Sequence, residues 1–149
     1  MNKSLKLFAR FLIALALIWA VTGLNKAIAQ EKTVKIKMDF NNHEAVIEMF
    51  DNPAGRDFLT MLPLTAIFED YDRAAKITYL PRKLTTKGSP TARQLQGDFT
   101  YYAPWGNLAI FYKGSGSDDS LYVLGRIISG KDKLAAMDQS FTATIERLE

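Results

Sequence analysis

Apolar and polar residues alternate along several segments of the chain, and the first of these covers residues 34–40. Its even positions are Val, Ile, Met and Phe, and the odd positions between them are Lys, Lys and Asp. This alternation predicts a strand with one buried face and one solvent-exposed face. Two asparagines follow at residues 41–42. Because asparagine tolerates positive φ, we expect a tight hairpin into a second strand over residues 45–49.

A helix is predicted directly after the second strand. Residues 51–52, Asp and Asn, offer an N-cap, and Pro53 suits the first helical position. The apolar residues that follow share one helical face as far as Leu62. We expect the helix to end there, because Pro63 removes a backbone donor.

The rest of the chain alternates between strand patterns and turn-rich segments. Residues 97–112 predict two strands around a Pro-Trp-Gly-Asn turn, and residues 81–96 and 114–120 predict loops. The other expected elements are strands over 64–69, 76–80, 121–128 and 141–148, a connection over 70–73, and a short helix over 131–137. Many strands with two short helices, and no regular strand–helix alternation, indicate a mainly β fold, a closed β-barrel.

Residues 1–29 have the features of a cleaved signal peptide. A basic start precedes an apolar run from Phe11 to Leu24, and Ala27 to Ala29 supply the small residues of a cleavage site. The alternative is a membrane anchor, but the apolar run of about 14 residues is shorter than the roughly 18 that a spanning helix needs. We therefore expect one exported domain, residues 30–149, periplasmic or extracellular and without membrane attachment after cleavage.

Charge and cysteine content narrow the function classes. Four of the 19 lysine and arginine residues lie in the predicted signal peptide, so residues 30–149 carry 15 basic residues against 16 acidic ones. A nearly neutral domain argues against a nucleic-acid partner, which needs a concentrated basic face. The chain contains no cysteine, which excludes disulfides and a lipid-modified cysteine. Stability must therefore come from the hydrophobic core.

Several segments of the chain resemble known families. Three resemble cyclophilins in order and spacing: Val46–Phe50 leading into the predicted helix, Gly97-Asp98-Phe99, and Leu124–Ile127 followed by Gly130 and Met137. The chain is more similar still to the small bacterial cyclophilin-like domains of uncharacterised function, in the segments Leu80–Leu84, Gly97–Tyr112 and Leu124–Met137. The resemblance implies a closed cyclophilin-like barrel with two short helices over nearly all of residues 30–149.

The resemblance also bears on activity. Cyclophilins isomerise X-Pro bonds by holding the proline in an apolar pocket while an arginine hydrogen-bonds the peptide, and Arg82 falls near that catalytic arginine. Neither Gln94 nor Gln96 is at the position of the family's glutamine, and Leu121 is at the position where the pocket histidine is expected. The resemblance therefore implies a binding module for a small molecule or an extended peptide, without isomerase activity. The alternative is a reduced peptidyl-prolyl isomerase acting on envelope proteins.

We predict a ligand-binding site made of Arg82, Tyr101, Trp105 and Asn107. The long loop over residues 81–96 precedes the aromatic run, and loops of this length often carry sites. Arginine can orient a carbonyl or carboxylate through its planar fork. Aromatic side chains beside a turn form either barrel core or the wall of a pocket.

No metal or cofactor is predicted. His43 is the only histidine, and with no cysteine this argues against nucleophilic catalysis by a Ser-His-Asp triad or a Cys-His pair. The acidic residues 69–72 and 118–119 lack the ligand spacing of a calcium loop, and residues 114–120 lack the lysine of a phosphate loop. A structural interaction domain remains a third interpretation, and the oligomeric state is left open.

Overall fold

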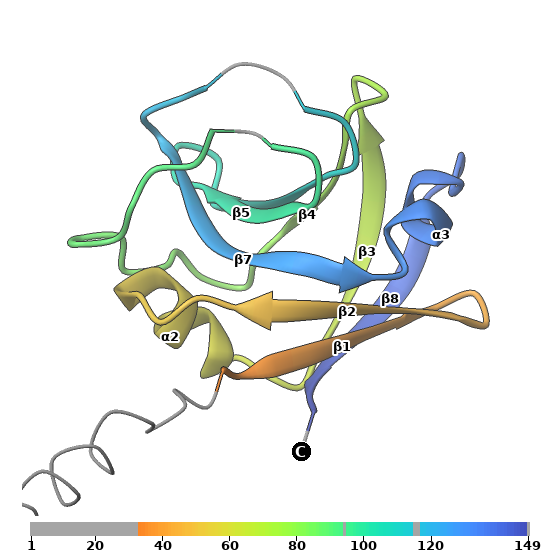
Figure 1. Ribbon diagram of the computed structural model, residues 1–149, viewed down its shortest axis with the longest axis horizontal. Coiled ribbons are helices and arrows are strands. Elements are labelled where there is room, and N and C mark those ends of the chain that lie inside the picture. The colour runs from red at the N-terminus through yellow and green to blue at the C-terminus, as the bar shows by residue number, and fades with distance from the viewer. Residues whose placement is uncertain (1–32, 94, 115–116, 149) are drawn as a thin grey trace, which may run out of the picture. The chain divides into compact units, whose positions relative to one another are not determined.

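The barrel is formed by eight antiparallel strands. The computed structural model describes residues 33–93, 95–114 and 117–148 (Figure 1). Within these residues the strands close in the order β1-β2-β7-β5-β6-β4-β3-β8. The strands are β1 Lys35–Phe40, β2 His43–Met49, β3 Leu64–Tyr71, β4 Ala75–Tyr79, β5 Asp98–Tyr102, β6 Asn107–Phe111, β7 Leu121–Ser129 and β8 Phe141–Arg147. With the helices α2 (Pro53–Leu59) and α3 (Lys131–Ala135), this confirms the predicted fold class. The predicted signal peptide lies outside the described residues.

The first hairpin forms as its sequence predicts. Asn41 and Asn42 have φ angles of 43° and 61°, the left-handed values that a two-residue turn requires. Phe40 and His43 are the closing pair of β1 and β2. The exposed His43 ring contacts Phe40 edge-on, with 6.0 Å between the ring centroids. This histidine is therefore part of a surface hairpin.

Helix α2 begins as predicted but ends earlier. The side chain of Asn52 accepts a hydrogen bond from the backbone N–H of Gly55 (2.9 Å), and Pro53 occupies the first turn. The predicted end at Leu62 is wrong, because the helix ends at Leu59. The N–H and hydroxyl of Thr60 both donate to the carbonyl of Asp57, which tightens the last turn and stops the i→i+4 pattern.

The connection between β3 and β4 is shorter than predicted. Strand β3 continues through Tyr71, which pairs with Ala75 on β4. The turn consists of the residues between them, and Asp72 and Arg73 have positive φ angles of 50° and 48°. A carboxylate oxygen of Asp70 accepts the N–H of Arg73 (3.0 Å) and stabilises this turn. As a result Tyr71 lies on a strand rather than in a loop.

The barrel interior holds one continuous hydrophobic core. Phe58 of α2 packs edge-on against Phe99 of β5, with 5.3 Å between centroids, and Leu134 of α3 is also fully buried. In Figure 1, α2 and α3 lie at opposite ends of the β2–β7 pair. Gly130 precedes α3 with φ 79°, and a Cβ there would lie 2.1 Å from a carbonyl oxygen of β2. The two helices therefore cover the two ends of the core.

The residues of the cyclophilin resemblance meet in this framework. Gly97 directly precedes β5, Asp98 and Phe99 begin it, and residues 124–127 lie beside them on β7. Asp98, 2% exposed, accepts a hydrogen bond from the guanidinium of Arg126 (3.0 Å). Gly125 is required because a Cβ would lie 2.4 Å from a carbonyl oxygen of β2. These residues stabilise the packing of β5, β7 and β2 against one another, so we interpret them as structural.

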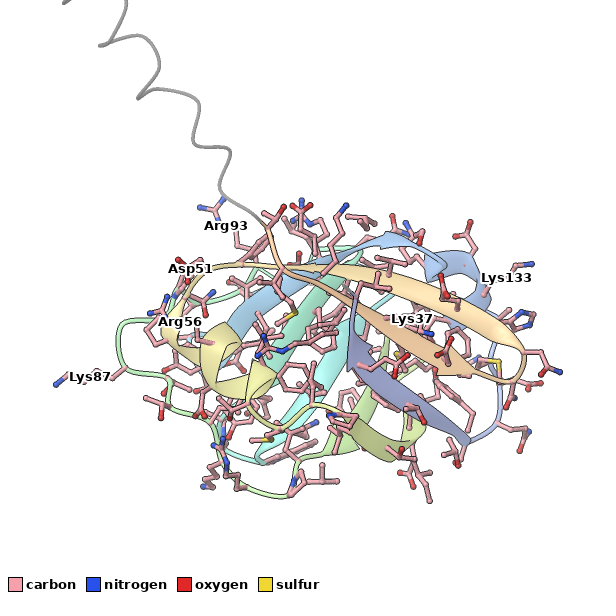
Figure 2. All side chains as sticks on the ribbon, turned by 90° about the horizontal axis from the view of Figure 1, so that it is seen from below. Lys37, Asp51, Arg56, Lys87, Arg93 and Lys133 are labelled. Carbon is pink, nitrogen blue, oxygen red and sulfur yellow. The ribbon has the colours of Figure 1, made fainter. Side chains whose placement is uncertain are left out.

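The loop over residues 81–96 is tied to the barrel along its length. The N–H of Thr85 donates to a carboxylate oxygen of Asp57 (2.7 Å), and Ser89 Oγ accepts from the N–H of Ala54 at the start of α2 (2.8 Å). The N–H of Ala92 donates to a carbonyl of β7 (2.7 Å). Lys87, on the same loop, points away from the barrel (Figure 2). The first half of the loop thus packs on α2, and the second half hydrogen-bonds to the backbone of β7.

Candidate functional site

A pocket lies on the outer face of the barrel. It has a volume of about 150 Å³. Ala75 and Ile77 on β4 and Ala109 on β6 contribute small or aliphatic side chains to it. Because strand residues alternate between faces, these side chains point away from the barrel core. They belong to a second hydrophobic cluster, separate from the interior.

Aromatic side chains form the walls of this outer-face pocket. Trp105, in the turn between β5 and β6, lies between Tyr71 of β3 and Tyr102 of β5. The Trp105 ring centroid is 5.8 Å from that of Tyr71 and 5.5 Å from that of Tyr102, and both pairs are at 84°. Tyr71 is 47% exposed and Trp105 49% exposed. Such exposure of large rings around a hollow is typical of a binding surface.

Asn107 brings a polar group into the pocket. It is 2% exposed and pairs across the sheet with Tyr79 on one side and Tyr102 on the other. Its amide nitrogen donates to the backbone carbonyl of Leu108 at 3.3 Å. Among the residues that the structure describes, its Oδ1 atom has no hydrogen-bond partner. An unpaired buried acceptor costs about 1–3 kcal/mol, so its presence calls for an explanation.

Asp118 gives the pocket its only charged side chain among the described residues. It lies in the connection between β6 and β7, and its Oδ1 atom accepts the N–H of Ser120 (2.7 Å). Within the described ranges no lysine or arginine forms an ion pair with it. The pocket therefore combines apolar walls, one neutral acceptor and one negative charge.

The structure brings two of the four predicted site residues together. Trp105 and Asn107 both line the pocket. Tyr101 does not line it, because this residue faces the barrel interior with 1% exposure, and its hydroxyl accepts the N–H of Leu84 (3.2 Å). Alternation along β5 places Tyr101 inside and the neighbouring Tyr102 outside. Phe99 shares the inward face of β5 with Tyr101.

Arg82 is engaged elsewhere. Its guanidinium donates to Asp57 Oδ1 (2.7 Å) and to the hydroxyl of Thr60 (2.8 Å), both at the end of α2. The hydrogen bond from Arg82 is the main reason that the pKa of Asp57 is lowered to about 2, and it also raises the pKa of Arg82 itself. Arg82 thus ties the 81–96 loop to α2 and does not line the pocket.

The four predicted site residues leave out most of the pocket lining, including Tyr71, Tyr102 and Asp118. Tyr71 falls in the predicted connection over residues 70–73, and Asp118 falls in the predicted loop over residues 114–120. Tyr71 lies four residues after Ile67, so strand alternation places both on the outer face. This spacing was an available signal for Tyr71. Nothing local could bring Asp118 to the pocket, because its place depends on how β6 and β7 pair with β5.

A second group of titratable side chains lies at the end of the barrel near α3. Lys76 is 1% exposed, and its ammonium donates to Asp70 Oδ1 (2.7 Å) and to the carbonyl of Met137. Burial raises the pKa of Tyr112 to about 12, with the Asp70 hydrogen bond adding to it. Burial also acts to raise the pKa of Asp70, but hydrogen bonds from Lys76 and Tyr112 outweigh it and lower that pKa. These groups satisfy one another, so we interpret them as structural.

In residues 33–93, 95–114 and 117–148, no three histidine, cysteine, aspartate or glutamate side chains gather in a group that could hold a metal ion. Within the same part of the chain, no helix has the length and apolar character needed to cross a membrane.

Comparison with protein families identifies the fold family. The model of the cyclophilin-like family matches residues 38–146, a span that runs from β1 into β8. The chain belongs to the cyclophilin-like family. The family resemblance noted in the sequence is therefore confirmed. A search of curated proteins found no match.

Two solved structures share the fold of this cyclophilin-like domain. The hypothetical protein AF2241 from Archaeoglobus fulgidus superposes with a TM-score of 0.62 at 16% identity, over 80% of this chain and 99% of the archaeal one. McbB, solved in complex with tryptophan, superposes with a TM-score of 0.56 at 6% identity. That match covers 74% of this chain and 44% of McbB. At these identities the likeness concerns the fold alone.

Proposed function

We propose that this cyclophilin-like domain is a binding module for a small molecule, which it holds in the outer-face pocket. The observation that carries the proposal is the buried Asn107 Oδ1 atom, which has no partner among the described residues. A ligand with an N–H or O–H group would supply the missing donor. Trp105, Tyr71 and Tyr102 would contact the rest of the ligand.

The size of the pocket limits the ligand. A cavity of roughly 150 Å³ accommodates a molecule about as large as benzene, and drug-sized ligands occupy about 300–1,000 Å³. The pocket, at about 150 Å³, therefore suits a single ring or a short branched group. McbB, which shares the fold, is described in complex with tryptophan, and this supports small-molecule binding as a use of the fold.

The proposal does not include prolyl isomerisation. In cyclophilins the catalytic arginine must hydrogen-bond the substrate peptide, and here the guanidinium of Arg82 already bonds to Asp57 and Thr60. The proposal keeps export and signal cleavage after Ala29, with the domain in the periplasm or the extracellular medium. N-terminal sequencing of the protein recovered from its native compartment tests that part.

The binding proposal is tested with small hydrogen-bond donors: indole, phenol and benzyl alcohol. In the ¹⁵N-labelled full chain, we expect at least one to give a saturable shift of the Trp105 indole N–H signal. Asn107→Leu should weaken that binding at least tenfold, because one hydrogen bond to a buried acceptor is lost. Arg82→Ala is the control and should leave the affinity unchanged.

Two outcomes would contradict the proposal. The first is that none of the three probes gives a saturable shift at Trp105 up to its solubility limit. The second is that a probe binds the Asn107→Leu variant as tightly as the unaltered chain. If Arg82→Ala weakened binding as much as Asn107→Leu, the site would have to be extended to the α2 corner, by which we mean α2 with its bonded residues Asn52, Asp57, Thr60, Arg82 and Thr85.

A further inference from the structure

We infer that the pocket selects an organic cation, an alkylated ammonium group that carries a hydroxyl or N–H donor. This inference rests on the proposed function and names its ligand class. Its basis is the combination of several aromatic side chains, one acidic side chain and one unpaired acceptor in a single pocket.

The arrangement of the rings supports a cation. The Trp105 ring stands at 84° to both Tyr71 and Tyr102, and all three aromatic side chains line the pocket. Aromatic faces carry partial negative charge and attract a cation that lies within about 6 Å of the ring centroid. Several such faces around one space attract it together, as in the aromatic cages that bind methylated ammonium groups.

The charges of the lining residues also favour a cationic ligand. Asp118 is the only ionisable acid or base among the described lining residues apart from the tyrosines, and its charge is negative. A ligand anion would meet Asp118 without a lysine or arginine to balance it within the lining. A ligand cation would instead have a counter-ion in Asp118 and aromatic side chains beside it.

Hydrogen-bonding capacity separates an alkylated ammonium from a primary one. A primary ammonium has three N–H donors and is strongly hydrated, so its transfer to a pocket with mostly apolar walls costs more than the transfer of an alkylated ammonium. The acceptors of the described lining are Asn107 Oδ1, the Asp118 carboxylate and the hydroxyls of Tyr71 and Tyr102, and its other side chains are aliphatic or aromatic. An ammonium covered by methyl groups needs no acceptors, and the remaining donor on the ligand can bond to Asn107.

The test uses two probes that differ only in charge. Choline carries a trimethylammonium group and a hydroxyl, and 3,3-dimethylbutan-1-ol has the same shape with carbon in place of the nitrogen. We expect the full chain to bind choline at least tenfold more tightly, as followed by calorimetry and by the Trp105 indole N–H signal. Trp105→Leu and Asp118→Asn should each reduce this preference severalfold. Asp119→Asn is the matched control, because the neighbouring Asp119 is exposed and does not line the pocket.

The outcomes separate this inference from the proposed function. Equal binding of choline and its uncharged counterpart, or binding of the neutral donors alone, would overturn the cation inference and leave the small-molecule proposal standing. Failure of every probe, neutral and charged, would overturn both. A preference for choline that survives both Trp105→Leu and Asp118→Asn would place the cation site outside this pocket and also overturn the inference.

Discussion

Two buried asparagines lie in two regions of the molecule and differ in how their side chains are bonded. Asn52, at the α2 corner, accepts from Gly55 N–H (2.9 Å) and donates to the carbonyl of Val123 on β7 (3.0 Å). Asn107, in the outer-face pocket, has an Oδ1 atom without a partner among the described residues. Both are less than a tenth exposed. The α2 corner completes its own hydrogen bonds, and the pocket does not.

The difference shows how a structural polar cluster can be told from a candidate site. At the α2 corner Asp57 bonds to Arg82 and to the N–H of Thr85, so each charge is neutralised within the protein. The pocket keeps half-exposed rings and an unpaired buried oxygen, both of which cost stability in the free protein. Such a cost is expected where a ligand completes the structure.

The largest expected effect is on stability, and it distinguishes the inward face of β5 from its outward face. Tyr101→Ala should lower the free energy of unfolding by about 3–5 kcal/mol, because it empties a fully buried aromatic site. Tyr102→Ala, at the half-buried neighbour, should cost less than about 2 kcal/mol and weaken ligand binding instead. Urea unfolding measures the first effect and probe titration the second.

A milder variant covers the case in which Tyr101→Ala does not fold. Tyr101→Phe removes only the hydrogen bond that the hydroxyl accepts from Leu84 and should cost about 1 kcal/mol. If Tyr101 variants that fold lost ligand affinity while Tyr102→Ala kept it, the assignment of the two faces would be wrong.

The two asparagines allow the same substitution in both regions. Asn52→Leu should cost about 2 kcal/mol, because α2 loses its cap and the Val123 carbonyl loses its donor. Asn107→Leu should change the free energy of unfolding by less than about 1 kcal/mol, or raise it, since a buried unpaired oxygen is removed. Urea denaturation of both variants measures the difference. Equal destabilisation by both would indicate that Asn107 has a structural role.

The smallest expected effect is a pH-dependent change in the free energy of unfolding when Asp57 of the α2 corner is replaced. The pKa of Asp57 is about 2 in the folded protein, against 3.8 ordinarily, so its ionised form stabilises the fold above about pH 4. Asp57→Asn should therefore cost about 1 kcal/mol near neutral pH. This difference should shrink as the pH falls from about 4 towards 2. A difference between the two proteins that stayed constant over that range would contradict the lowered pKa.

Much of the fold could be predicted from short stretches of sequence. The hairpin at residues 41–42, the cap at Asn52 and the strand alternation over residues 34–40 depend on neighbours within a few positions. The errors came at element ends. Helix α2 ended before Leu62 and β3 ran on to Tyr71, because turn hydrogen bonds rather than residue patterns set those limits.

The candidate site could be predicted only in part. Trp105 and Asn107 lie within three residues of each other on one turn and strand, so the sequence itself places them together. Arg82 was predicted to join Trp105 and Asn107 in the site because the loop that contains it precedes the aromatic run. Its ion pair with Asp57, 25 positions earlier in the chain, directs it to α2 instead.

The sequence by itself therefore determined the barrel class and the aromatic turn, since these follow from periodicity and local turn chemistry. It also determined the family, through the resemblance of several segments to cyclophilin-like domains. Only the tertiary structure decided which face of β5 is the core, that Tyr71 and Asp118 join Trp105, and that Asn107 is left unpaired. The physical reason is that these contacts depend on strand pairing between distant segments. The pairing of β3 with β4, of β4 with β6, and of β5 with β6 and β7 places residues from five strands around one pocket.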